Sequence, residues 1–346
     1  MKAAVFHGAG QALAIETVPD PAPGPNDLVL KVHACGICGS DLHMADIHDA
    51  AGGIPPLPKG TVMGHEFSGE IVAVGRDVRD RWQTGMRVTA MPMIGCGKCL
   101  ACLSGKPLRC AGGQGIGLGQ VAGAYAEYIR VGAGESFRLP ESVDDQAGAM
   151  VEPLAVGLHA VNTARLQRGE SVLIIGAGPI GLAVASWCRF FGVRHVVVSD
   201  LVKSRLDRAA DLGATGCIEA DREDVPARAA AIAGGAPNVV FDCVGVPGSQ
   251  QLAMHYAPAD GRVMVVGVCM QLDHLMPVLA IGKELQVNYV LAYRHQDFAF
   301  TVEMLAAGRI DPHPMLSGTV GFDGFPAAFE ALKTSKAECK VMLRPG

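Results

Sequence analysis

Cys38, His65 and Glu66 supply a thiol, an imidazole and a carboxylate within one short stretch of the chain. Zinc uses these ligand types when it takes part in a reaction. Three protein ligands leave a position for water or substrate, whereas a structural zinc is usually closed by four. A bound zinc ion lowers the pKa of a coordinated hydroxyl group toward neutrality. The pattern therefore predicts chemistry on an alcohol, and it requires a hydride acceptor elsewhere in the chain.

A second group of thiols follows the pattern Cys96-x2-Cys99-x2-Cys102-x7-Cys110. Four cysteines with two-residue spacers are typical of a closed tetrahedral zinc site. An iron–sulfur cluster and a redox thiol set are the alternatives, but no proline follows the last cysteine as it does in bacterial ferredoxins. We therefore expect a structural zinc that orders a glycine-rich lobe at about residues 95–111.

The hydride acceptor is indicated by a glycine-rich loop, Gly176-Ala177-Gly178-Pro179-Ile180-Gly181, between an apolar strand-like run and a helical segment. In this context the glycines allow a tight turn and a close approach of a pyrophosphate to the helix N-terminus. Asp200 ends the next predicted strand, where an acid binds the ribose hydroxyls and repels a 2′-phosphate. The loop thus favours NAD over NADP, although Arg205 lies close enough to weaken that preference or to stack on the adenine.

The elements that must position these residues follow two different sequence patterns, one in each part of the chain. Short β-prone segments separated by turns dominate the first 150 residues, at 28–32, 70–74 and 87–90. From residue 171 onward strand-like runs at 172–175, 196–199, 239–242 and 263–266 alternate with helical segments such as 182–191 and 204–212. This alternation predicts a parallel sheet with helices on both faces. After about residue 289 the regularity weakens, and we expect one helix at 325–333 and a strand at 340–343.

The composition limits the class of protein. A chain of 346 residues with 49% hydrophobic and 18% charged residues is typical of a globular protein of two domains. A net charge of -5 argues against nucleic acid or an anionic membrane as partner. Eleven cysteines, no secretory signal and no long apolar run indicate the reducing cytoplasm, where clustered thiols bind metal.

Taken together, the motifs resemble those of the zinc-dependent medium-chain alcohol and polyol dehydrogenases, in particular the sorbitol and threonine dehydrogenase branch. The resemblance covers essentially the whole chain. It includes the four-cysteine lobe, the glycine loop, Gly36-Ile-Cys38-Gly-Ser-Asp-Leu-His43, Gly64-His-Glu-Phe-Ser-Gly-Glu-Ile-Val-Ala-Val-Gly75, Glu152-Pro-Leu-Ala and Lys283-Glu-Leu.

For the zinc site, the resemblance implies Cys38 and His65 as ligands of a catalytic ion. Glu66 and Glu152 compete for the place of the third protein ligand, and the sequence does not rank them. Asp41 would orient His65 by accepting its other ring proton. The resemblance further implies that Ser40 hydrogen-bonds the substrate hydroxyl and that His43 passes its proton onward through the ribose hydroxyls.

The resemblance also implies an overall organisation. A chaperonin-10-like (GroES-like) β-rich catalytic domain would span residues 1–150, a Rossmann domain with a doubly wound parallel sheet residues 151–289, and a return to the catalytic domain residues 290–346. Family members are homodimers or homotetramers. Cys243, Val244 and Gly245 would border the adenosine. The nicotinamide and its ribose would be lined by Ile180, Val266, Gly267, Val268, Leu291, Ala292 and Tyr293.

The prediction of the substrate rests on a position where this sequence differs from the polyol dehydrogenases that it resembles. Met44 follows His43, where polyol dehydrogenases commonly carry a tyrosine, and a thioether cannot donate a hydrogen bond. Residues 112–119 are also almost free of bulky side chains. We therefore expect a secondary alcohol, cyclic or fairly apolar, with a polyol or an amino alcohol as the alternative. Two other classes compete: a zinc- and nucleotide-binding structural or regulatory protein without turnover, and a zinc-free reductase of activated double bonds.

Overall fold

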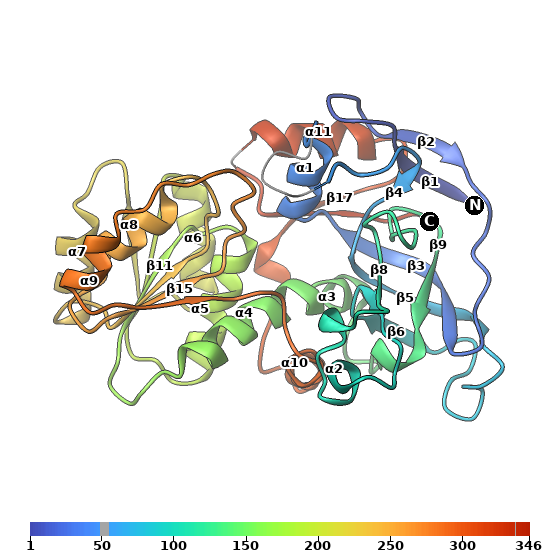
Figure 1. Cartoon of the computed structure of the whole chain (residues 1–346), viewed down its shortest axis with the longest axis horizontal. Helices are drawn as coiled ribbons and strands as arrows, with labels where there is room; N and C mark the ends of the chain where they lie inside the picture. The colour runs from blue at the N-terminus through green and yellow to red at the C-terminus, as the bar shows by residue number, and fades with distance from the viewer. Residues whose placement is uncertain (49–54, 336) are drawn as a thin grey trace. The chain divides into compact units, whose positions relative to one another are not determined.

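The computed structural model describes residues 1–48, 55–335 and 337–346. The chain divides into two compact units, each built from segments that are distant in sequence (Figure 1). Unit 1 comprises Met1–Glu152, Tyr293–Arg309 and Leu316–Gly346, and unit 2 comprises Pro153–Ala292 and Ile310–Met315. Among the described residues no helix is long and apolar enough to cross a membrane.

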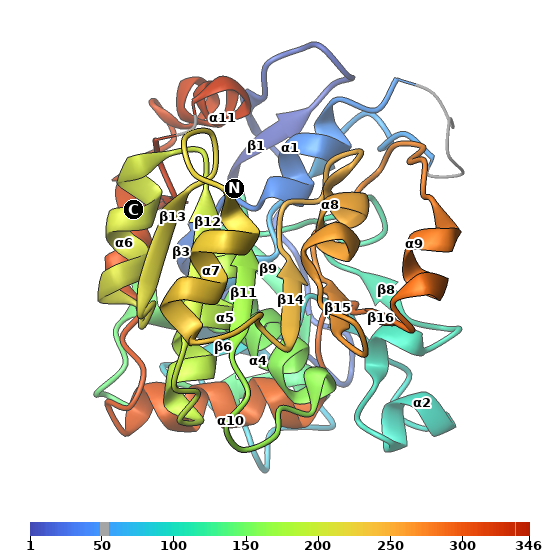
Figure 2. The ribbon, with the colours of Figure 1, turned by 90° about the vertical axis from the view of Figure 1, so that its left-hand side faces the viewer.

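Unit 2 contains a six-stranded parallel sheet in the order β13-β12-β11-β14-β15-β16 (Figure 2). The order reverses between β11 and β14, which creates the switch point where doubly wound folds bind nucleotides. The elements are β11 Val172–Ile175, α5 Pro179–Phe190, β12 Val196–Asp200, α6 Lys203–Asp211, β13 Gly216–Glu219, α7 Val225–Ala233, β14 Val239–Asp242, α8 Ser249–Tyr256, β15 Arg262–Val265, α9 Pro277–Gly282 and β16 Gln286–Tyr289. The predicted fold class is confirmed for this unit.

Alternation along the strands explains why helices cover both faces of this sheet. Leu173 and Ile175 of β11 join Val240 of β14 in one buried cluster, together with residues of α7 and α8. Their neighbours Val172 and Ile174 are equally buried but lie outside that cluster, on the face that receives α5 and α6. Strands buried on both faces read as continuous apolar runs, as the sequence does here.

Unit 1 is built on mainly antiparallel sheets, with β17 and β18 paired in parallel. The largest follows the path β10-β6-β5-β3-β18-β17, with β9 also paired to β3, and a smaller sheet has the order β2-β1-β4. The elements are β1 Lys2–Phe6, β2 Ala14–Thr17, β3 Asp27–Gly36, α1 Gly39–Ala45, β4 Thr61–Val62, β5 Glu66–Val74, β6 Arg87–Ala90, β7 Met93–Ile94, α2 Leu100–Leu103, β8 Gln114–Gly115, β9 Tyr128–Gly132, β10 Ser136–Arg138, α3 Asp145–Ala149, α10 His295–Ala306, β17 Leu316–Val320, α11 Phe325–Thr334 and β18 Lys340–Leu343.

The pairing of β18 with β3 matters most for the site. It places Met342 opposite Gly36 and Leu343 opposite Cys35, so the end of the chain lies beside the segment that leads into α1. On its other side β3 pairs with β5, and Gly36 lies opposite Glu66. Three segments that are far apart in sequence therefore meet at the carboxyl end of β3.

The expectation of weak regularity after residue 289 was incomplete. The structure adds the twelve-residue helix α10 and the strand β17 to the expected α11 and β18. Asp297 stabilises the start of α10 because its carboxylate accepts a hydrogen bond of 2.9 Å from the backbone N–H of Arg294. A further helix that had not been expected, α4 Val151–Ala164, joins the two units in sequence.

Candidate active site

The side chains of Cys38, His65 and Glu66 converge in unit 1, with their ligand atoms all within 4.8 Å of one another. Cys38 is the residue that caps the N-terminus of α1, and Glu66 is the first residue of β5. The β3–β5 pairing brings the two together, since it sets Glu66 opposite Gly36 just before Cys38. A thiolate, an imidazole and a carboxylate at this separation fit a single zinc ion that keeps an open coordination position.

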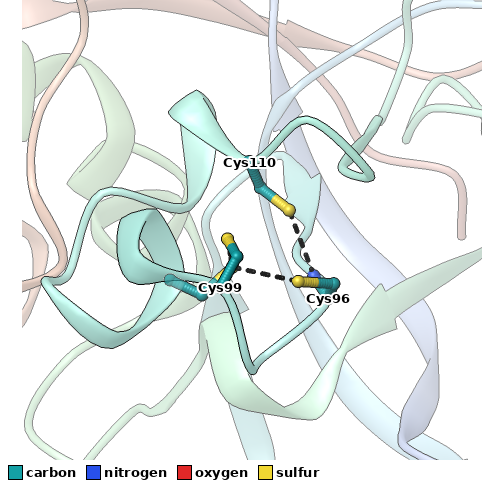
Figure 3. Close-up of side chains that lie close together, drawn as sticks. Cys96, Cys99 and Cys110 are labelled. Carbon is teal, nitrogen blue, oxygen red and sulfur yellow. Dashed lines mark hydrogen bonds between the residues drawn. The ribbon is translucent and has the colours of Figure 1, made fainter.

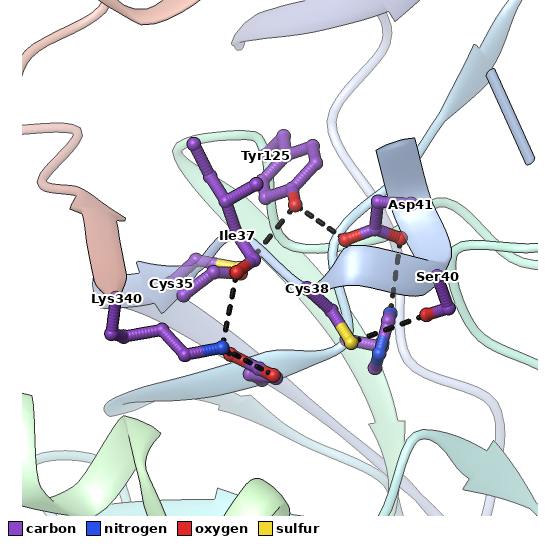
Figure 4. Close-up of polar contacts among 10 residues, drawn as sticks. Cys35, Ile37, Cys38, Ser40, Asp41, Tyr125 and Lys340 are labelled. Carbon is purple, nitrogen blue, oxygen red and sulfur yellow. Dashed lines mark hydrogen bonds and ion pairs between the residues drawn. The ribbon is translucent and has the colours of Figure 1, made fainter. Parts of the chain in front are cut away.

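His65 is held by Asp41. The Asp41 carboxylate lies 3.1 Å from Nδ1 of His65, and the Tyr125 hydroxyl donates a hydrogen bond to its other oxygen (Figure 4). Burial alone would lower the pKa of His65, but the charges of Asp41 and Cys38 raise it well above its ordinary value. Burial would raise the pKa of Asp41, yet the His65 charge keeps it low. The pair fixes the imidazole with Nδ1 toward Asp41, so Nε2 is the nitrogen that would bind a metal ion.

Tyr125 was not singled out from the sequence. Its ring lies against Gly64, where a β-carbon would overlap the ring, and Gly64 has a φ of 97°. The glycine of the Gly64-His-Glu motif is therefore needed for two reasons, the left-handed backbone and the close approach of Tyr125.

Glu66 forms a buried ion pair with Lys340. The Lys340 Nζ lies 2.6 and 2.7 Å from the two carboxylate oxygens and 3.0 Å from the carbonyl oxygen of Ile37 (Figure 4). Each of the two side chains is only 1% exposed. Burial would lower the pKa of Lys340, but the Glu66 charge raises it above its ordinary value. Lys340 was also missed in the sequence, and it reaches the site because β18 pairs with β3.

Glu152, the other candidate ligand, lies in the first turn of α4 and is 7% exposed. It does not belong to the group whose ligand atoms lie within 4.8 Å of one another. Burial raises the pKa of Glu152 to about 7, the nearby Glu66 charge adds to this, and His65 opposes it. The two acids that the sequence could not rank therefore occupy different environments.

Three residues of α1 that follow Cys38, namely Ser40, His43 and Met44, have different surroundings. Ser40 donates a hydrogen bond of 3.2 Å from its hydroxyl to the Cys38 sulfur (Figure 4). His43 is exposed. Met44 is half-buried and packs against the hydrophobic core of unit 1. Met44 thus contributes to the core of unit 1.

The four cysteines of the lobe also converge (Figure 3). The Cys102 sulfur lies 3.6 Å from that of Cys99 and 4.0 Å from that of Cys96, and the backbone N–H of Cys96 donates to the Cys110 sulfur. Backbone N–H groups of Lys98 and Cys99 lower the pKa of the Cys96 thiol to about 6. Four sulfurs at these distances fit a tetrahedral zinc ion with no open position.

The glycine loop of unit 2 follows β11 and leads into α5. Gly176 has a φ of 95°, and Gly178 caps α5 with its backbone extended. A side chain on Gly181 would overlap the carbonyl oxygen of Gly176. The Asp200 carboxylate accepts hydrogen bonds of 2.7 Å from Ala177 N–H and 2.8 Å from Val202 N–H, so it is fixed at the end of β12.

The remaining predicted cofactor residues separate into groups. A cavity of about 300 Å³ in unit 2 is lined in part by Val266, Gly267 and Val268, beside the buried carboxylate of Asp242. Leu291 belongs to unit 2 but is exposed and outside that cavity, as is Val244. Ile180 lies in the first turn of α5 and Arg205 on α6, whereas Ala292 ends its segment of unit 2 at a φ of 49°. Tyr293 lies in unit 1 beside Glu152.

The comparisons with known proteins agree with this geometry. Residues 24–141 match the family model of the alcohol dehydrogenase GroES-like domain, and residues 179–307 match that of zinc-binding dehydrogenases. The sorbitol dehydrogenase of Bacillus subtilis (strain 168) is 32% identical and the match covers 100% of this chain and 97% of the relative. The L-threonine 3-dehydrogenase of Aeromonas salmonicida is also 32% identical, over 94% of each chain.

Solved structures show the same fold. A zinc-binding dehydrogenase from Sinorhizobium meliloti 1021 with bound NADP matches with a TM-score of 0.88 at 31% identity, over 99% of both chains. An alcohol dehydrogenase from Escherichia coli CFT073 with bound NADH matches with a TM-score of 0.87 at 28% identity, again over 99% of both chains.

This chain belongs to the zinc-dependent medium-chain alcohol dehydrogenase family, which confirms the resemblance of its motifs. It is an oxidoreductase that acts on small-molecule alcohols or ketones with a nicotinamide nucleotide. The rival classes of a protein without turnover and a zinc-free reductase are not favoured by these matches.

Proposed function

We propose that the protein catalyses hydride transfer between NAD and a secondary alcohol/ketone pair. The observation that carries the proposal is the convergence of Cys38, His65 and Glu66 in unit 1, in a chain whose other unit holds a dinucleotide-binding loop. A polyol or an amino alcohol is the alternative substrate, since the relatives named above are sorbitol and threonine dehydrogenases.

In this proposal Cys38, His65 and Glu66 hold the catalytic zinc. Their donor set and spacing support this choice over Glu152, which lies outside the cluster. Zinc supplies a positive charge that makes the substrate hydroxyl acidic near neutral pH. The bidentate contact of Lys340 does not compete with this role, because a carboxylate offers about four lone pairs and Lys340 uses two. The second zinc belongs to Cys96, Cys99, Cys102 and Cys110.

The proton would leave along residues of α1. Ser40 holds a rotatable hydroxyl next to the Cys38 sulfur, so it can turn from that sulfur to the substrate hydroxyl. It would accept the substrate proton while it releases its own hydroxyl proton toward His43. Exposed His43, one turn further along α1, would pass the proton to solvent. Asp41 takes no proton, since the His65 charge and two hydrogen bonds keep it ionised. Its role is to orient His65.

NAD is proposed over NADP because of Asp200. Its carboxylate is fixed by two backbone N–H groups at the end of β12, where the ribose of the adenosine would bind. A 2′-phosphate would meet a fixed negative charge. Replacing Asp200 with Asn should therefore shift the preference toward NADP, measured as the ratio of kcat/KM for the two cofactors.

The argument from Met44 for an apolar substrate is weakened. Because Met44 packs against the core of unit 1, its thioether says little about the polarity of the pocket. The lack of bulky side chains at residues 112–119 still supports a secondary alcohol that is cyclic or fairly apolar.

We also propose an assembly built on a homodimer. The strand β16 pairs only with β15 among the described residues, so its outer edge is open. Several apolar side chains near this edge are exposed, and an open edge with such a patch is a pairing surface. They are Leu272, Met276, Val278, Ile281, Tyr289 and Leu291. A cytoplasmic location is supported by the eleven cysteines, which are all free thiols.

The deciding experiment is an alcohol panel with NAD and NADP in parallel, read as formation of the reduced cofactor, together with elemental analysis. We expect turnover of secondary alcohols with NAD and two zinc ions per chain. Absence of turnover on every secondary alcohol, polyol and amino alcohol would contradict the proposal. Fewer than one zinc per chain in active protein would contradict the metal-dependent mechanism.

A further inference from the structure

Tyr125 is a fully buried residue that connects the segment of His65 to the carboxylate of Asp41. Its backbone N–H donates a hydrogen bond of 2.9 Å to the carbonyl oxygen of Met63, two residues before His65. Its ring lies against Gly64, and its hydroxyl donates a hydrogen bond to the Asp41 carboxylate (Figure 4). One residue therefore sets the separation between the segment that carries the imidazole and the acid that orients it.

The surrounding core fixes the phenol ring of Tyr125. Two aromatic rings of α11 pack against it, Phe325 with ring centroids 4.7 Å apart and Phe329 with centroids 6.2 Å apart. All three side chains are completely buried. A closely packed interior holds its side chains in single low-energy rotamers, so the hydroxyl of Tyr125 is presented at a fixed point.

The Asp41 carboxylate needs a second partner to keep its orientation. The terminal torsion of an aspartate side chain is broad, and Nδ1 of His65, at 3.1 Å, holds only one of the two oxygens. The Tyr125 hydroxyl holds the other oxygen. Because Asp41 is only 2% exposed, bulk water does not supply this hydrogen bond. With both oxygens held, the plane of the carboxylate is fixed, and so is the imidazole ring that it contacts.

We propose that Tyr125 is a positioning residue of the reaction site, which acts through Asp41 to hold His65 in the orientation that binds the catalytic zinc. The inference rests on the proposed function, because it concerns the zinc site of Cys38, His65 and Glu66, and it deepens that proposal. Outer partners of metal-bound histidines fix the direction of the ring and strengthen metal binding. The hydroxyl of Tyr125 is then a requirement of the metal site, whereas its ring is a requirement of the core.

The test compares Tyr125→Phe, which keeps the ring and removes the hydroxyl, with wild-type protein by chelator competition for zinc. We expect the affinity of the site of Cys38 to fall about 10-fold, the lower end of the effect of removing an outer partner of a metal ligand. The ion on the four cysteines of the lobe is the internal control, identified by its loss in Cys110→Ser, and its affinity should change less than about twofold. Tyr128→Phe, at a half-buried position of β9, should change neither affinity.

A second comparison separates positioning from simple packing. In an Asp41→Ala background the phenol has no carboxylate to hold, so Tyr125→Phe should change the zinc affinity by less than about twofold. Cobalt(II) exchanged into the site of Cys38 gives a spectroscopic measurement. Its visible absorption bands should shift in Tyr125→Phe, because the orientation of His65 changes, and should not shift in Tyr128→Phe.

An unchanged affinity at the site of Cys38, with unshifted cobalt bands, would overturn the inference and leave Tyr125 as a residue of the core. An equal loss of affinity in the Asp41→Ala background would also overturn it, because the tyrosine would then act by another route. A wild type that binds zinc only on the four cysteines of the lobe would instead remove the catalytic metal site, and with it the proposed function itself.

Discussion

Replacing Lys340 with Met should destabilise the metal-free protein strongly. The substitution keeps the length of the side chain and removes the cation that faces the Glu66 carboxylate at 2.6 and 2.7 Å. Because both side chains are 1% exposed, the carboxylate cannot turn to solvent. Removing one partner of a buried ion pair costs about 3–5 kcal/mol, since the other charge is left without compensation. We expect a loss of that size in the free energy of unfolding.

The pairs that Lys333 forms with two exposed acids provide the control. Lys333 is itself 15% exposed and lies 2.9 Å from Asp46 and 3.0 Å from Glu330, whose side chains are 53% and 40% exposed. Because both carboxylates can turn to solvent, Lys333→Met should cost less than about 1 kcal/mol. The double variant Lys340→Met/Glu66→Gln should recover part of the loss, because it removes the uncompensated charge. Neither effect depends on catalysis.

Denaturant unfolding followed by tryptophan fluorescence suits this comparison. The chain has two tryptophans, and Trp82 lies in unit 1 while Trp187 lies in unit 2. In a Trp187→Phe background the signal reports unit 1 alone. If Glu66 ligates zinc, added zinc should stabilise the Lys340→Met protein more than its parent, because the ion replaces the lost cation. A loss below about 1 kcal/mol in the metal-free state would refute the argument from the buried pair.

Three further predictions concern the metal sites and pH. Asp41→Asn should weaken zinc binding about 10- to 100-fold in chelator competition, because His65 loses its orienting acceptor; unchanged zinc release would contradict that role. Cys110→Ser should lower the zinc content from two ions per chain to one while the catalytic ion is retained, as elemental analysis would show. Glu152 has a pKa of about 7 in the folded protein, against an ordinary value of 4.5. Between these two pH values the folded metal-free protein binds more protons than the unfolded chain. The free energy of unfolding therefore falls as the pH rises through this range. Glu152→Gln should therefore gain roughly 1–3 kcal/mol over the parent at pH 8 and nothing at pH 4, and equal stability at both values would contradict the raised pKa.

The strands of unit 2 could be predicted closely because they are buried on both faces. The expected segments at 172–175 and 239–242 match β11 and β14 to the residue, since continuous apolar runs end at polar turns. The helix α4 was missed because Pro153 and Gly157 disfavour a helix. In the structure Pro153 lies in its first turn, and Gly157 lies where a β-carbon would overlap Ala183 of α5. Gly157 therefore made α4 hard to predict from the sequence, and the same residue allows α4 to pack closely against α5.

The site was predicted where its residues are close in sequence and missed where they are distant. Cys38, Ser40, Asp41 and His43 lie on or next to one short helix, so their motif marks them together. Lys340 reaches Glu66 only through the pairing of β18 with β3, a register that no local pattern specifies. A lysine within the apolar run of a closing strand was the available signal. Nothing local distinguished Tyr125.

The two acids that the sequence could not rank differ in their buried partners. Glu66 has Lys340 as a buried counter-ion, so a positive charge already faces its carboxylate. Burial dominates the environment of Glu152, whose pKa is raised to about 7 with the Tyr293 phenol beside it. An acid that titrates near neutrality is suited to exchange protons or to hold a neutral ligand, whereas a carboxylate that already faces a cation is suited to carry a negative charge. The two environments support the proposed division of roles, with Glu66 as the metal ligand and Glu152 as a partner of the substrate or its water.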